Sequence, residues 1–542
     1  MPLAGRSYDE VRNAFSWAIP ARFNIATAIC DRHAGTGRIA LIHETADGTA
    51  ADFTFEVLQE RSRRLANALL AHGIDRGDRI GILLPQCPEA LIAHLAAYRI
   101  GAIALPLFTL FGPDALAYRL NDSGARAVVS NAEGVEKLVQ LRDQLTASPL
   151  LISIEDRVDG ATLGWSSLIE AASSTHTTVD TAAEDPAIIV YTSGTTGNAK
   201  GVLYAHRTLL GHMPGVEFPH DFFPQPGDCM WTPADWAWAG GLMDVLLPSL
   251  FHGIPVLAKR LKKFDPEEAF ALIGRHSIRN AFMPPTALKM MRQVTRPQEK
   301  FAYAMRSIAS GGERLGEEML GWGRETFGLT MNEFYGQTEA NLTIGNCASI
   351  MRLKEGSMGR AMPGHVLEVV DDEGNPVRAG ETGTIAVKAP DPVFFLRYWN
   401  KPDATEDKFR NGWLLTGDTG HRDEEGYFWF HGRNDDVIIS GGYRIGPTEI
   451  EDCLMQHPAV ALVAVIGVPD SVRGEIVKAF VVPRAGATVD DALREDLQHF
   501  VKARLSAHEY PRQIEIRDSL PMTITGKIRR KDLRDEAGGA TS

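Results

Sequence analysis

A loop that follows a short buried strand sets the strongest constraint on this chain. The loop runs from Tyr191 to Gly201, reads Tyr-Thr-Ser-Gly-Thr-Thr-Gly-Asn-Ala-Lys-Gly, and follows the β-branched run Ala187 to Val190. Open α/β sheets bind ligands beyond the carboxyl ends of their strands. Small residues let the backbone approach an anion, hydroxyls donate to phosphate oxygens, and Lys200 adds a positive charge. The stretch predicts a polyphosphate site on an α/β sheet; taken alone, it is also compatible with a surface linker.

The loop differs from a Walker A phosphate loop. That motif places a metal-binding Ser or Thr directly after the lysine, whereas Gly201 follows Lys200 here. A metal ligand must therefore come from elsewhere in the chain. In Phe334-Tyr-Gly-Gln-Thr-Glu339 a hydroxyl and a carboxylate are adjacent. Mg²⁺ prefers carboxylate and phosphate oxygens, so Glu339 is a candidate metal ligand and Thr338 a phosphate contact. A helix start capped by Thr338 is the alternative for this pair.

Alternating strand and helix patterns predict the fold class. Strands at Arg79 to Leu84 and Ala102 to Leu105 flank a helix at Pro88 to Ile100, which is a βαβ unit with parallel strands. Further elements of this kind are a helix at Phe53 to Ala71, a helix at Pro113 to Leu120, and strands at Ala127 to Ser130 and Leu150 to Ile154. Later strands end in turns at Phe282 to Pro285 and at Ser307 to Glu313.

The pattern changes twice toward the C-terminus. Strands at Leu367 to Val370 and Thr384 to Lys388, separated by turn residues, predict a β-rich subdomain over about residues 359–434. A compact α+β region follows. Its predicted elements are strands at 437–440, 460–466, 477–482 and 513–516 and helices at 447–456 and 490–505. We therefore predict an α/β protein with a large N-terminal domain, residues 1–434, of mostly parallel subdomains plus the β-rich subdomain, and a small α+β C-terminal domain, residues 435–542.

Composition narrows the class of partner. The 542 residues carry a formal net charge of −13, which argues against a general nucleic-acid or anionic-membrane surface. The most apolar stretch, Ile80 to Leu110, is broken by prolines and Arg99, so we predict no membrane span. The five cysteines show no metal or disulfide spacing, and the first residues lack a signal-peptide pattern. We expect a cytoplasmic enzyme with structural thiols.

Other candidate site residues lie in aromatic, acidic and basic segments. Trp231, Trp236 and Trp238 stand beside glycines and are compatible with either an apolar pocket wall or ordinary core aromatics. Asp418, in Thr416-Gly-Asp, is a candidate ribose contact, although a Gly-Asp pair by itself is a turn. The basic tail Pro521 to Lys531 is usually a solvated surface, but Thr525 and Gly526 predict a turn that presents Lys527.

Together these motifs resemble, over nearly the whole chain, the adenylate-forming (ANL) superfamily, and most closely the medium-chain acyl-CoA synthetases. The phosphate loop, the Tyr335-Gly-Gln-Thr-Glu motif, Thr416-Gly-Asp, Gly432-Arg433 and the Gly526-Lys527 tail occur in the family's order and at its spacing. The resemblance implies an AMP-forming acid–thiol ligase of fatty-acid metabolism. Such a ligase would convert a carboxylate, ATP and coenzyme A, with Mg²⁺, to acyl-CoA, AMP and diphosphate through an acyl-adenylate.

The resemblance also implies roles for individual residues. The ATP-binding residues would be Thr192, Ser193, Gly194, Thr195, Thr196, Gly197, Lys200, Gly311, Gly312, Glu313, Tyr335, Gly336, Gln337, Thr338, Asp418 and Arg433. Lys527, Thr338 and Glu339 would be catalytic, with Glu339 on Mg²⁺ and Lys527 between the carboxylate and the α-phosphate. The coenzyme A tunnel would be lined by Gly441, Gly442, Tyr443 and Arg444. Asp435 matches the hinge about which a mobile C-terminal domain turns between the two half-reactions.

The acid is the part that the resemblance leaves open. Acetate-specific members carry Trp where this chain has Gly336, so we expect an acyl pocket, walled by Trp231, Trp236 and Trp238, that admits medium-chain, branched or aromatic acids. An acyl-AMP ligase that loads the pantetheine arm of a carrier protein is the alternative function. A silent nucleotide-binding scaffold is disfavoured because Lys527, Glu339 and the loop hydroxyls are all present. The oligomeric state stays open, a homodimer included.

Overall fold

The computed structural model describes residues 5–192, 199–433, 436, 438–440, 443–470, 473–505, 510–523 and 527–539. The chain separates into two compact units. The first comprises Met1–Val366 and Lys388–Phe409, and the second comprises Leu367–Val387 and Arg410–Ser542. The predicted hinge residue, Asp435, lies outside the described residues. The division at residue 434 and the hinge therefore stay predictions.

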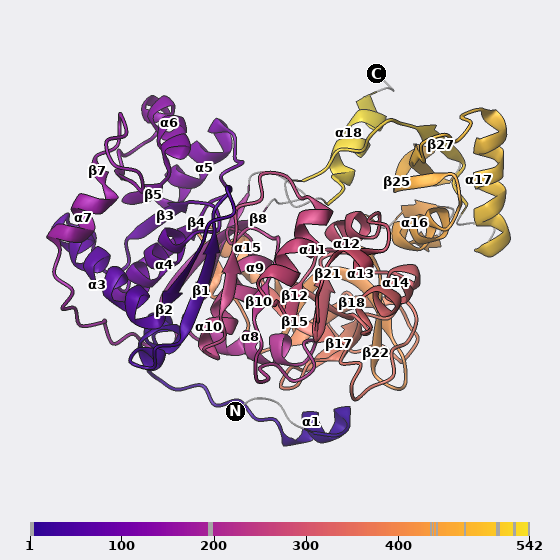
Figure 1. Ribbon diagram of the computed structural model, residues 1–542. Helices are drawn as coiled ribbons and strands as arrows, with labels where there is room; N and C mark the ends of the chain where they lie inside the picture. The colour runs from indigo at the N-terminus through magenta and orange to yellow at the C-terminus, as the bar shows by residue number, and fades with distance from the viewer. Residues whose placement is uncertain are drawn as a thin grey trace. The chain divides into compact units, whose positions relative to one another are not determined.

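The first sheet of the first unit is mostly parallel (Figure 1). Its strand order is β19-β9-β8-β4-β3-β5-β6-β7. The bounds are β3 (Arg79–Leu83), β4 (Ile103–Pro106), β5 (Ala127–Ser130), β6 (Leu150–Ser153), β7 (Leu163–Gly164), β8 (Pro186–Thr192), β9 (Lys200–Ala205) and β19 (Arg397–Tyr398). The strands β3 to β8 pair in parallel, as their continuous apolar runs predict for strands buried on both faces. At one edge of the sheet, β9 runs antiparallel to β8, and β19 runs antiparallel to β9.

Helices that connect these strands follow the predicted pattern. They are α3 (Phe55–Ala71), α4 (Pro88–Ile100), α5 (Pro113–Ser123), α6 (Ala132–Gln140), η2 (Arg142–Gln144) and α7 (Trp165–Ala171). The helix α4 begins at a proline, which suits the first turn, and ends at Gly101 in the left-handed region with φ 71°. The proline and the glycine are both visible in the sequence, and the predicted bounds of α4 are confirmed.

The second sheet of the first unit carries the other predicted motifs. Its strand order is β16-β15-β14-β13-β12-β10-β11-β1-β2. The bounds are β1 (Ile39–Glu44), β2 (Ala50–Thr54), β10 (Met230–Trp231), β11 (Val256–Ala258), β12 (Asn280–Phe282), β13 (Ser307–Gly311), β14 (Asn332–Gln337), β15 (Ala340–Gly345) and β16 (Gly359–Ala361). The strands from β1 to β14 along this order pair in parallel, and β2, β15 and β16 are antiparallel additions.

The remaining helices of the first unit are short. They are α1 (Tyr8–Ala14), α2 (Ile25–Ile29), η1 (Asp31–His33), α8 (Thr208–Glu217), α9 (Ala239–Gly241), the π-helix η3 (Leu242–Leu246), α10 (Leu247–Phe251), α11 (Pro266–Arg275), α12 (Pro285–Met291), α13 (Pro297–Lys300), α14 (Glu317–Phe327) and α15 (Pro402–Glu406). A hydrophobic core lies between the helices α11, α12 and α14 and the strands β10, β12 and β13.

The second unit contains a β-rich part and an α+β part, whose strands pair antiparallel except for β27, which joins β26 in parallel. The β-rich part has β17 (Leu367–Val370), β18 (Gly383–Lys388), β20 (Phe409–Arg410), β21 (Trp413–Arg422) and β22 (Tyr427–Arg433). The α+β part has β23 (Ile438–Ser440), β24 (Tyr443–Ile445), α16 (Pro447–Met455), β25 (Val460–Asp470), β26 (Gly474–Pro483), α17 (Asp491–Arg504), β27 (Gln513–Ile516) and α18 (Arg530–Gly539). Both the β-rich and the α+β region are confirmed at the level of their elements.

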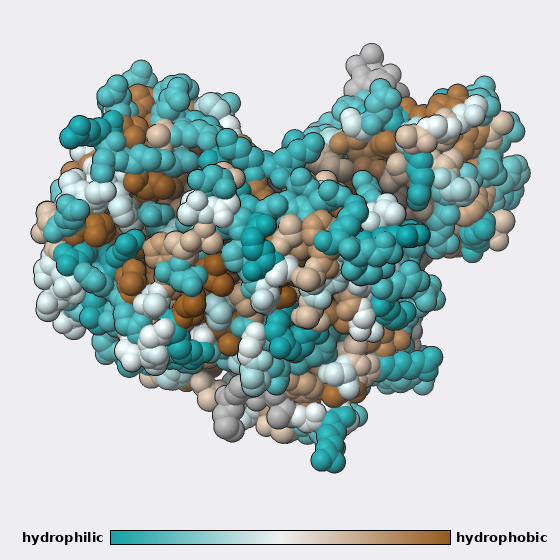
Figure 2. Space-filling view, viewed as in Figure 1, coloured by the Kyte–Doolittle hydropathy of each residue, from teal (hydrophilic) through white to brown (hydrophobic). Residues whose placement is uncertain are grey.

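The surface is mostly polar. Figure 2 shows one face on which hydrophilic residues predominate and apolar areas are scattered. Within the described part of the chain, no helix combines the length and the hydropathy that crossing a membrane requires. The five cysteines are buried free thiols, as expected for structural residues.

Candidate active site

The phosphate loop connects two antiparallel strands. At its base Thr192, the last residue of β8, is paired with Lys200, the first residue of β9, and the Thr192 hydroxyl donates to the Lys200 carbonyl over 3.4 Å. The predicted loop residues Ser193, Gly194, Thr195, Thr196 and Gly197 lie outside the described residues. The strand before the loop is confirmed, but the sequence did not predict the return strand β9.

Tyr191 anchors the β8 end of the loop. Its hydroxyl donates to Asp122 Oδ2 over 2.6 Å, and burial together with Asp122 raises the pKa of the Tyr191 phenol. A buried hydroxyl that is hydrogen-bonded to a carboxylate holds its side chain in one position. Tyr191 therefore positions the strand from which Thr192 extends.

Tyr398 brings the predicted phosphate lysine and the predicted metal ligand together. The Lys200 ammonium lies 5.1 Å from the centre of the Tyr398 ring, and the Tyr398 hydroxyl donates a hydrogen bond to Glu339 Oε1. Pairing of β19 with β9, with Tyr398 opposite Val202, sets this position. Lys200 and Glu339 thus meet on one side chain although 139 residues separate them in the sequence. Sequence reasoning missed Tyr398, since nothing around it forms a recognisable motif.

Thr338 and Glu339 form the turn between β14 and β15. These strands are antiparallel, with Gln337 opposite Ala340, so the alternative of a helix start capped by Thr338 is wrong. The turn is held from outside by main-chain contacts. The Tyr204 hydroxyl donates to the Thr338 carbonyl over 2.5 Å, and the Phe395 amide donates to the Glu339 carbonyl over 3.1 Å. These two hydrogen bonds fix the main chain of the turn, and therefore the position from which the Glu339 side chain extends.

Beside this turn, Gln337 and Tyr335 extend the motif along β14. The Gln337 amide oxygen accepts a hydrogen bond from Lys408 Nζ over 3.3 Å. Tyr335 is half-buried. Both residues belong to the end of β14 that leads into Thr338.

The predicted adenine residues lie at the end of the neighbouring strand β13. Gly311 is its last residue and is paired with Phe334 on β14. A Cβ atom on Gly311 would stand 2.4 Å from the Phe334 ring, and Gly312 has φ +96°, where side chains are strained. Both glycines are therefore required by the local backbone. Glu313, the next residue, is half-buried.

Gly336 is also required by its backbone surroundings. A Cβ atom there would lie 2.2 Å from the backbone nitrogen of Leu342 and 2.8 Å from Cα of Asn341. Leu342 itself has φ +54°, an uncommon conformation for a branched side chain. A larger residue at position 336 would displace the hairpin. The wider acyl pocket expected from Gly336 stays a prediction.

The three tryptophans differ in their surroundings. Trp231 belongs to the hydrophobic core, Trp236 is also buried, and Trp238 is half-buried. Ring contacts link Trp238 to Phe282 over 5.6 Å between centroids and Phe282 to Phe334 over 5.3 Å. Through Phe334, this aromatic series reaches Gly311. The segment that was predicted to wall the acyl pocket is therefore joined by packing to the predicted adenine residues.

The second unit holds the predicted ribose contacts. Asp418 on β21 is paired with Arg433 on β22, and Arg433 Nε lies 3.9 Å from Asp418 Oδ1. Asp418 is buried and Arg433 is exposed. The Thr416 hydroxyl donates to the Ile385 carbonyl over 2.6 Å and accepts from the Asp418 amide over 3.1 Å, so this threonine holds the strand that presents Asp418. The structure brings these two predicted residues together.

Lys527 follows a reversal of the chain. The Lys527 amide donates to the Thr523 hydroxyl over 3.0 Å, the Thr523 amide donates to the Lys527 carbonyl over 2.7 Å, and Met522 forms an antiparallel bridge with Ile528. The lysine is exposed, and the predicted turn residues Thr525 and Gly526 lie outside the described residues. Of the predicted coenzyme A residues, Gly441 and Gly442 lie outside the described residues, and Tyr443 and Arg444 are described only as backbone in β24.

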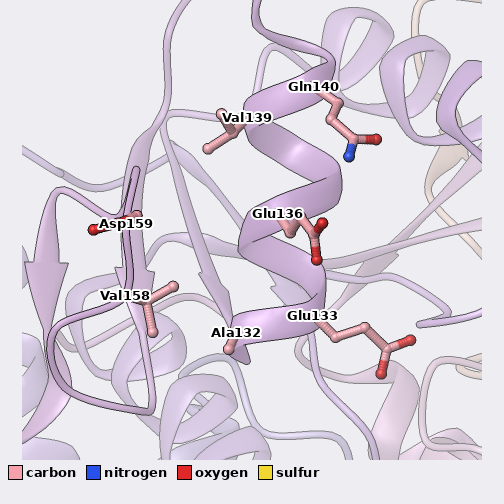
Figure 3. Close-up of a pocket in the computed structure, with 7 residues that line it drawn as sticks. All are labelled: Ala132, Glu133, Glu136, Val139, Gln140, Val158 and Asp159. Atoms are coloured by element: carbon pink, nitrogen blue, oxygen red, sulfur yellow. The ribbon is translucent and has the colours of Figure 1, made fainter.

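A hollow of about 520 Å³ on the first unit contains none of these motifs. Figure 3 shows it between α6 and the segment at Val158 and Asp159. The Glu133 and Glu136 side chains point to the side of α6 away from Val158. Glu133 pairs with Arg260 over 3.0 Å, so its charge is already compensated. The hollow presents no converging set of groups for phosphate.

Comparisons with known proteins agree with this geometry. Residues 30–399 match the model of the AMP-binding enzyme family, and residues 449–527 match that of the AMP-binding enzyme C-terminal domain. The chain is 35% identical to the acetyl-coenzyme A synthetase of Bacillus subtilis over 98% of this chain and 95% of that protein. It is 34% identical to the mitochondrial acyl-coenzyme A synthetase ACSM3 of Rattus norvegicus over 97% of this chain and 93% of that protein.

A solved structure shows the same fold. An anthranilate CoA ligase in complex with anthranoyl-AMP superposes with a TM-score of 0.86 at 27% identity, over 96% of this chain and 99% of that one. The chain therefore belongs to the AMP-binding enzymes of the adenylate-forming superfamily and, within them, to the acyl-coenzyme A synthetases, which are AMP-forming acid–thiol ligases.

Proposed function

We propose that this chain activates a carboxylic acid in two steps. A carboxylate oxygen attacks the α-phosphorus of ATP, the bond from the α-phosphorus to the bridging oxygen breaks, and diphosphate leaves. The thiolate of coenzyme A then attacks the acyl carbon, the bond to AMP breaks, and the thioester forms. Joining two anions in the first step requires positioning and positive charge more than a general base.

The single observation that carries this proposal is the convergence on Tyr398. A cation at the base of the phosphate loop and a carboxylate from the Thr338-Glu339 hairpin both contact this one side chain. Lys200 suits the leaving diphosphate, and the Glu339 carboxylate would hold a metal ion that neutralises charge on the phosphates. A site that contains both groups can bind a polyphosphate and the metal ion that accompanies it.

Mg²⁺ fits the donors that are present. This ion usually keeps several waters and binds one or two carboxylates plus substrate phosphates. Within the described part of the chain, no three acidic, histidine or cysteine side chains cluster as a metal cage, and Glu339 supplies a single carboxylate. When bound with the nucleotide, Mg²⁺ would neutralise charge on the phosphates, and Glu339 would orient it.

The other predicted residues complete this assignment. Residues 192–197 and Thr338 would donate to the β- and γ-phosphates. Gly311 to Glu313 and Tyr335 would line the adenine, and Asp418 with Arg433 would hold the ribose hydroxyls. Lys527 would bridge the carboxylate and the α-phosphate in the first step. It would then withdraw with the C-terminal domain, and residues 441–444 would line the coenzyme A tunnel.

For the acid we propose a medium-chain, branched or aromatic carboxylate. The relatives are named for acids as different in size as acetate and anthranilate, so the family does not decide the choice. Gly336, where acetate-specific members carry Trp, and Trp238, half-buried against Phe282, support a group larger than acetyl. Loading of a carrier protein's pantetheine arm remains the alternative for the second step.

A panel assay tests the proposal. The protein is incubated with MgATP, coenzyme A and C4 to C12 aliphatic or aromatic acids, and AMP release is followed. We expect acid-dependent AMP formation that matches thioester formation. Absence of AMP with every acid contradicts the proposal, and acid-dependent diphosphate release that requires a holo-carrier protein in place of coenzyme A favours the alternative.

A further inference from the structure

A buried polar pair lies directly behind the Thr338-Glu339 hairpin. The Asn341 amide donates to Asp244 Oδ1 over 2.6 Å, and only 4% of Asp244 and 8% of Asn341 is exposed. Neither residue is needed for the phosphate chemistry. The residues around Asp244 in η3 are Leu242, Met243, Val245 and Leu246, all apolar and fully buried.

Both residues sit on irregular backbone. Asp244 is at the centre of the π-helix η3, and a π-helical turn inside a helix often marks a functional site. Asn341 precedes Leu342, whose φ is +54°, and its side-chain oxygen accepts from the Leu342 amide over 3.1 Å. Strained backbone persists where the surroundings enforce it, commonly at ligand sites. The π-helical turn and the positive φ of Leu342 therefore both occur where the Asp244 carboxyl meets the Asn341 amide.

The pair borders the expected acyl site. Asn341 lies against Gly336, where an added Cβ would stand 2.8 Å from Cα of Asn341. The π-helix η3, which contains Asp244, directly follows α9, and α9 begins directly after Trp238. Burial first, then the charges of Glu339 and Asp244, raise the pKa of the Tyr204 phenol, whose hydroxyl binds the Thr338 carbonyl. Asp244 is thus within electrostatic range of the catalytic hairpin.

A further buried polar group lies in the segment that is expected to wall the acyl pocket. The indole N–H of Trp236 is buried and makes no hydrogen bond to any residue that the structure describes. A buried donor without a partner is costly and is usually met by a ligand or water. A few polar groups in an apolar ligand site orient the ligand, so a carboxyl, an amide and an indole N–H beside the expected acyl site favour a polar group on the acid.

We propose that Asp244 and Asn341 bind a hydroxyl group on the acyl chain, so that the preferred substrate is a hydroxylated carboxylic acid. This proposal rests on the acyl-CoA synthetase function proposed above. A hydroxyl both donates and accepts, which matches a carboxyl already bound by an amide. Burial raises the pKa of Asp244 despite the Asn341 hydrogen bond, which favours a neutral carboxyl and hence a neutral partner over an ammonium group.

The opposing reading is that the pair only fastens β15 to η3. In that case an unsubstituted acid would bind as well as a hydroxylated one. The two readings differ in discrimination, because a site built to hydrogen-bond a hydroxyl rejects the analogue that lacks it. Stability alone does not separate them.

The test compares matched acids that differ by one hydroxyl. Purified protein receives MgATP, coenzyme A and hexanoate or its 3-, 4-, 5- and 6-hydroxy derivatives, or benzoate or its hydroxy derivatives, and kcat/KM is measured from AMP release. We expect at least one hydroxylated acid to exceed its parent by about tenfold or more. This comparison uses the unaltered protein, so a variant that fails to fold does not affect it.

Variants then assign the preference to the pair. Asp244→Leu should lower the hydroxylated-to-parent ratio of kcat/KM by about tenfold or more. Met243→Leu, a volume-conserving change in the same π-helix, should leave the ratio unchanged. A wild-type protein that converts parent acids equally well, or a folded Asp244→Leu protein with an unaltered ratio, overturns the inference alone. Absence of AMP with every acid instead contradicts the proposed function.

Discussion

Replacing Tyr398 by Phe separates the hydrogen bond to Glu339 from the contact with Lys200. The phenylalanine ring keeps the surface that the Lys200 ammonium approaches at 5.1 Å, while the hydroxyl that donates to Glu339 is lost. Only 2% of Tyr398 is exposed, so water cannot easily replace the hydroxyl. The variant therefore removes one orienting bond from the proposed metal ligand and leaves the phosphate lysine in place.

The expected loss follows from the kind of bond. A hydrogen bond to a charged group contributes about 1.5 to 3 kcal/mol. At about 1.4 kcal/mol per decade, kcat/KM for ATP should fall by roughly 10- to 100-fold. Tyr398→Leu also removes the ring, and the lost cation–π contact of about 0.5 to 1 kcal/mol should reduce kcat/KM by a further two- to fivefold.

The assay is acid-dependent exchange of labelled diphosphate into ATP at low ATP concentration. The matched control is Tyr98→Phe on α4, which removes a buried hydroxyl 3.0 Å from His94 Nδ1. That variant should lower the melting temperature without changing kcat/KM for ATP. The reasoning is refuted if Tyr398→Phe keeps wild-type exchange, or if both variants lose activity equally.

Three further outcomes are expected. Lys527→Ala should reduce diphosphate exchange at least about a hundredfold but change the rate of thioester formation from supplied acyl-adenylate by less than about fivefold. Equal losses in the two assays would contradict alternation of the two domains. Gly336→Ala places a Cβ atom 2.2 Å from the backbone nitrogen of Leu342 and should lower the free energy of unfolding by about 1 to 3 kcal/mol. Gly321→Ala, on α14 with no atom near the added Cβ, should instead raise the free energy of unfolding by about 0.5 to 1 kcal/mol. Equal urea midpoints for the two variants would be inconsistent with this. Burial raises the pKa of Glu44, but hydrogen bonds from Arg275, Lys259 and His276 outweigh it and hold that pKa at about 2, below its unfolded value. Glu44→Gln should therefore cost about 2 to 3 kcal/mol of unfolding free energy at pH 7, a difference that shrinks as pH falls from about 4.5 toward 2, and a difference independent of pH in urea titrations would disprove the assignment.

Local signals made much of the fold predictable. Proline at the start and glycine at the end bounded α4, and β-branched runs bounded β5 and β27. The return strand β9 escaped prediction because its pairing with β8 depends on partners across the loop. The hairpin at Thr338 and Glu339 could not be told from a helix start, since both begin with the same residues.

The candidate site was predictable as a set of motifs but not as an arrangement. Glycines 311, 312 and 336 stood out in the sequence, yet the reasons for them, which are the closeness of Phe334 to Gly311 and of Leu342 to Gly336 and the positive φ of Gly312, are visible only in the folded chain. Tyr398 and Asp244 carried no sequence signal, because an isolated tyrosine or a buried aspartate has no spacing pattern. Their importance follows from the atoms beside them.

The central claim is that the carboxylate attacks the α-phosphorus of ATP. Following the label from an acid with ¹⁸O in its carboxylate tests this directly, because breaking the acyl–AMP bond leaves one carboxylate oxygen on the phosphorus. Mass spectrometry of the products formed with MgATP and coenzyme A should find one ¹⁸O atom in AMP and none in diphosphate. Label in inorganic phosphate, with ADP as the nucleotide product, would contradict the account.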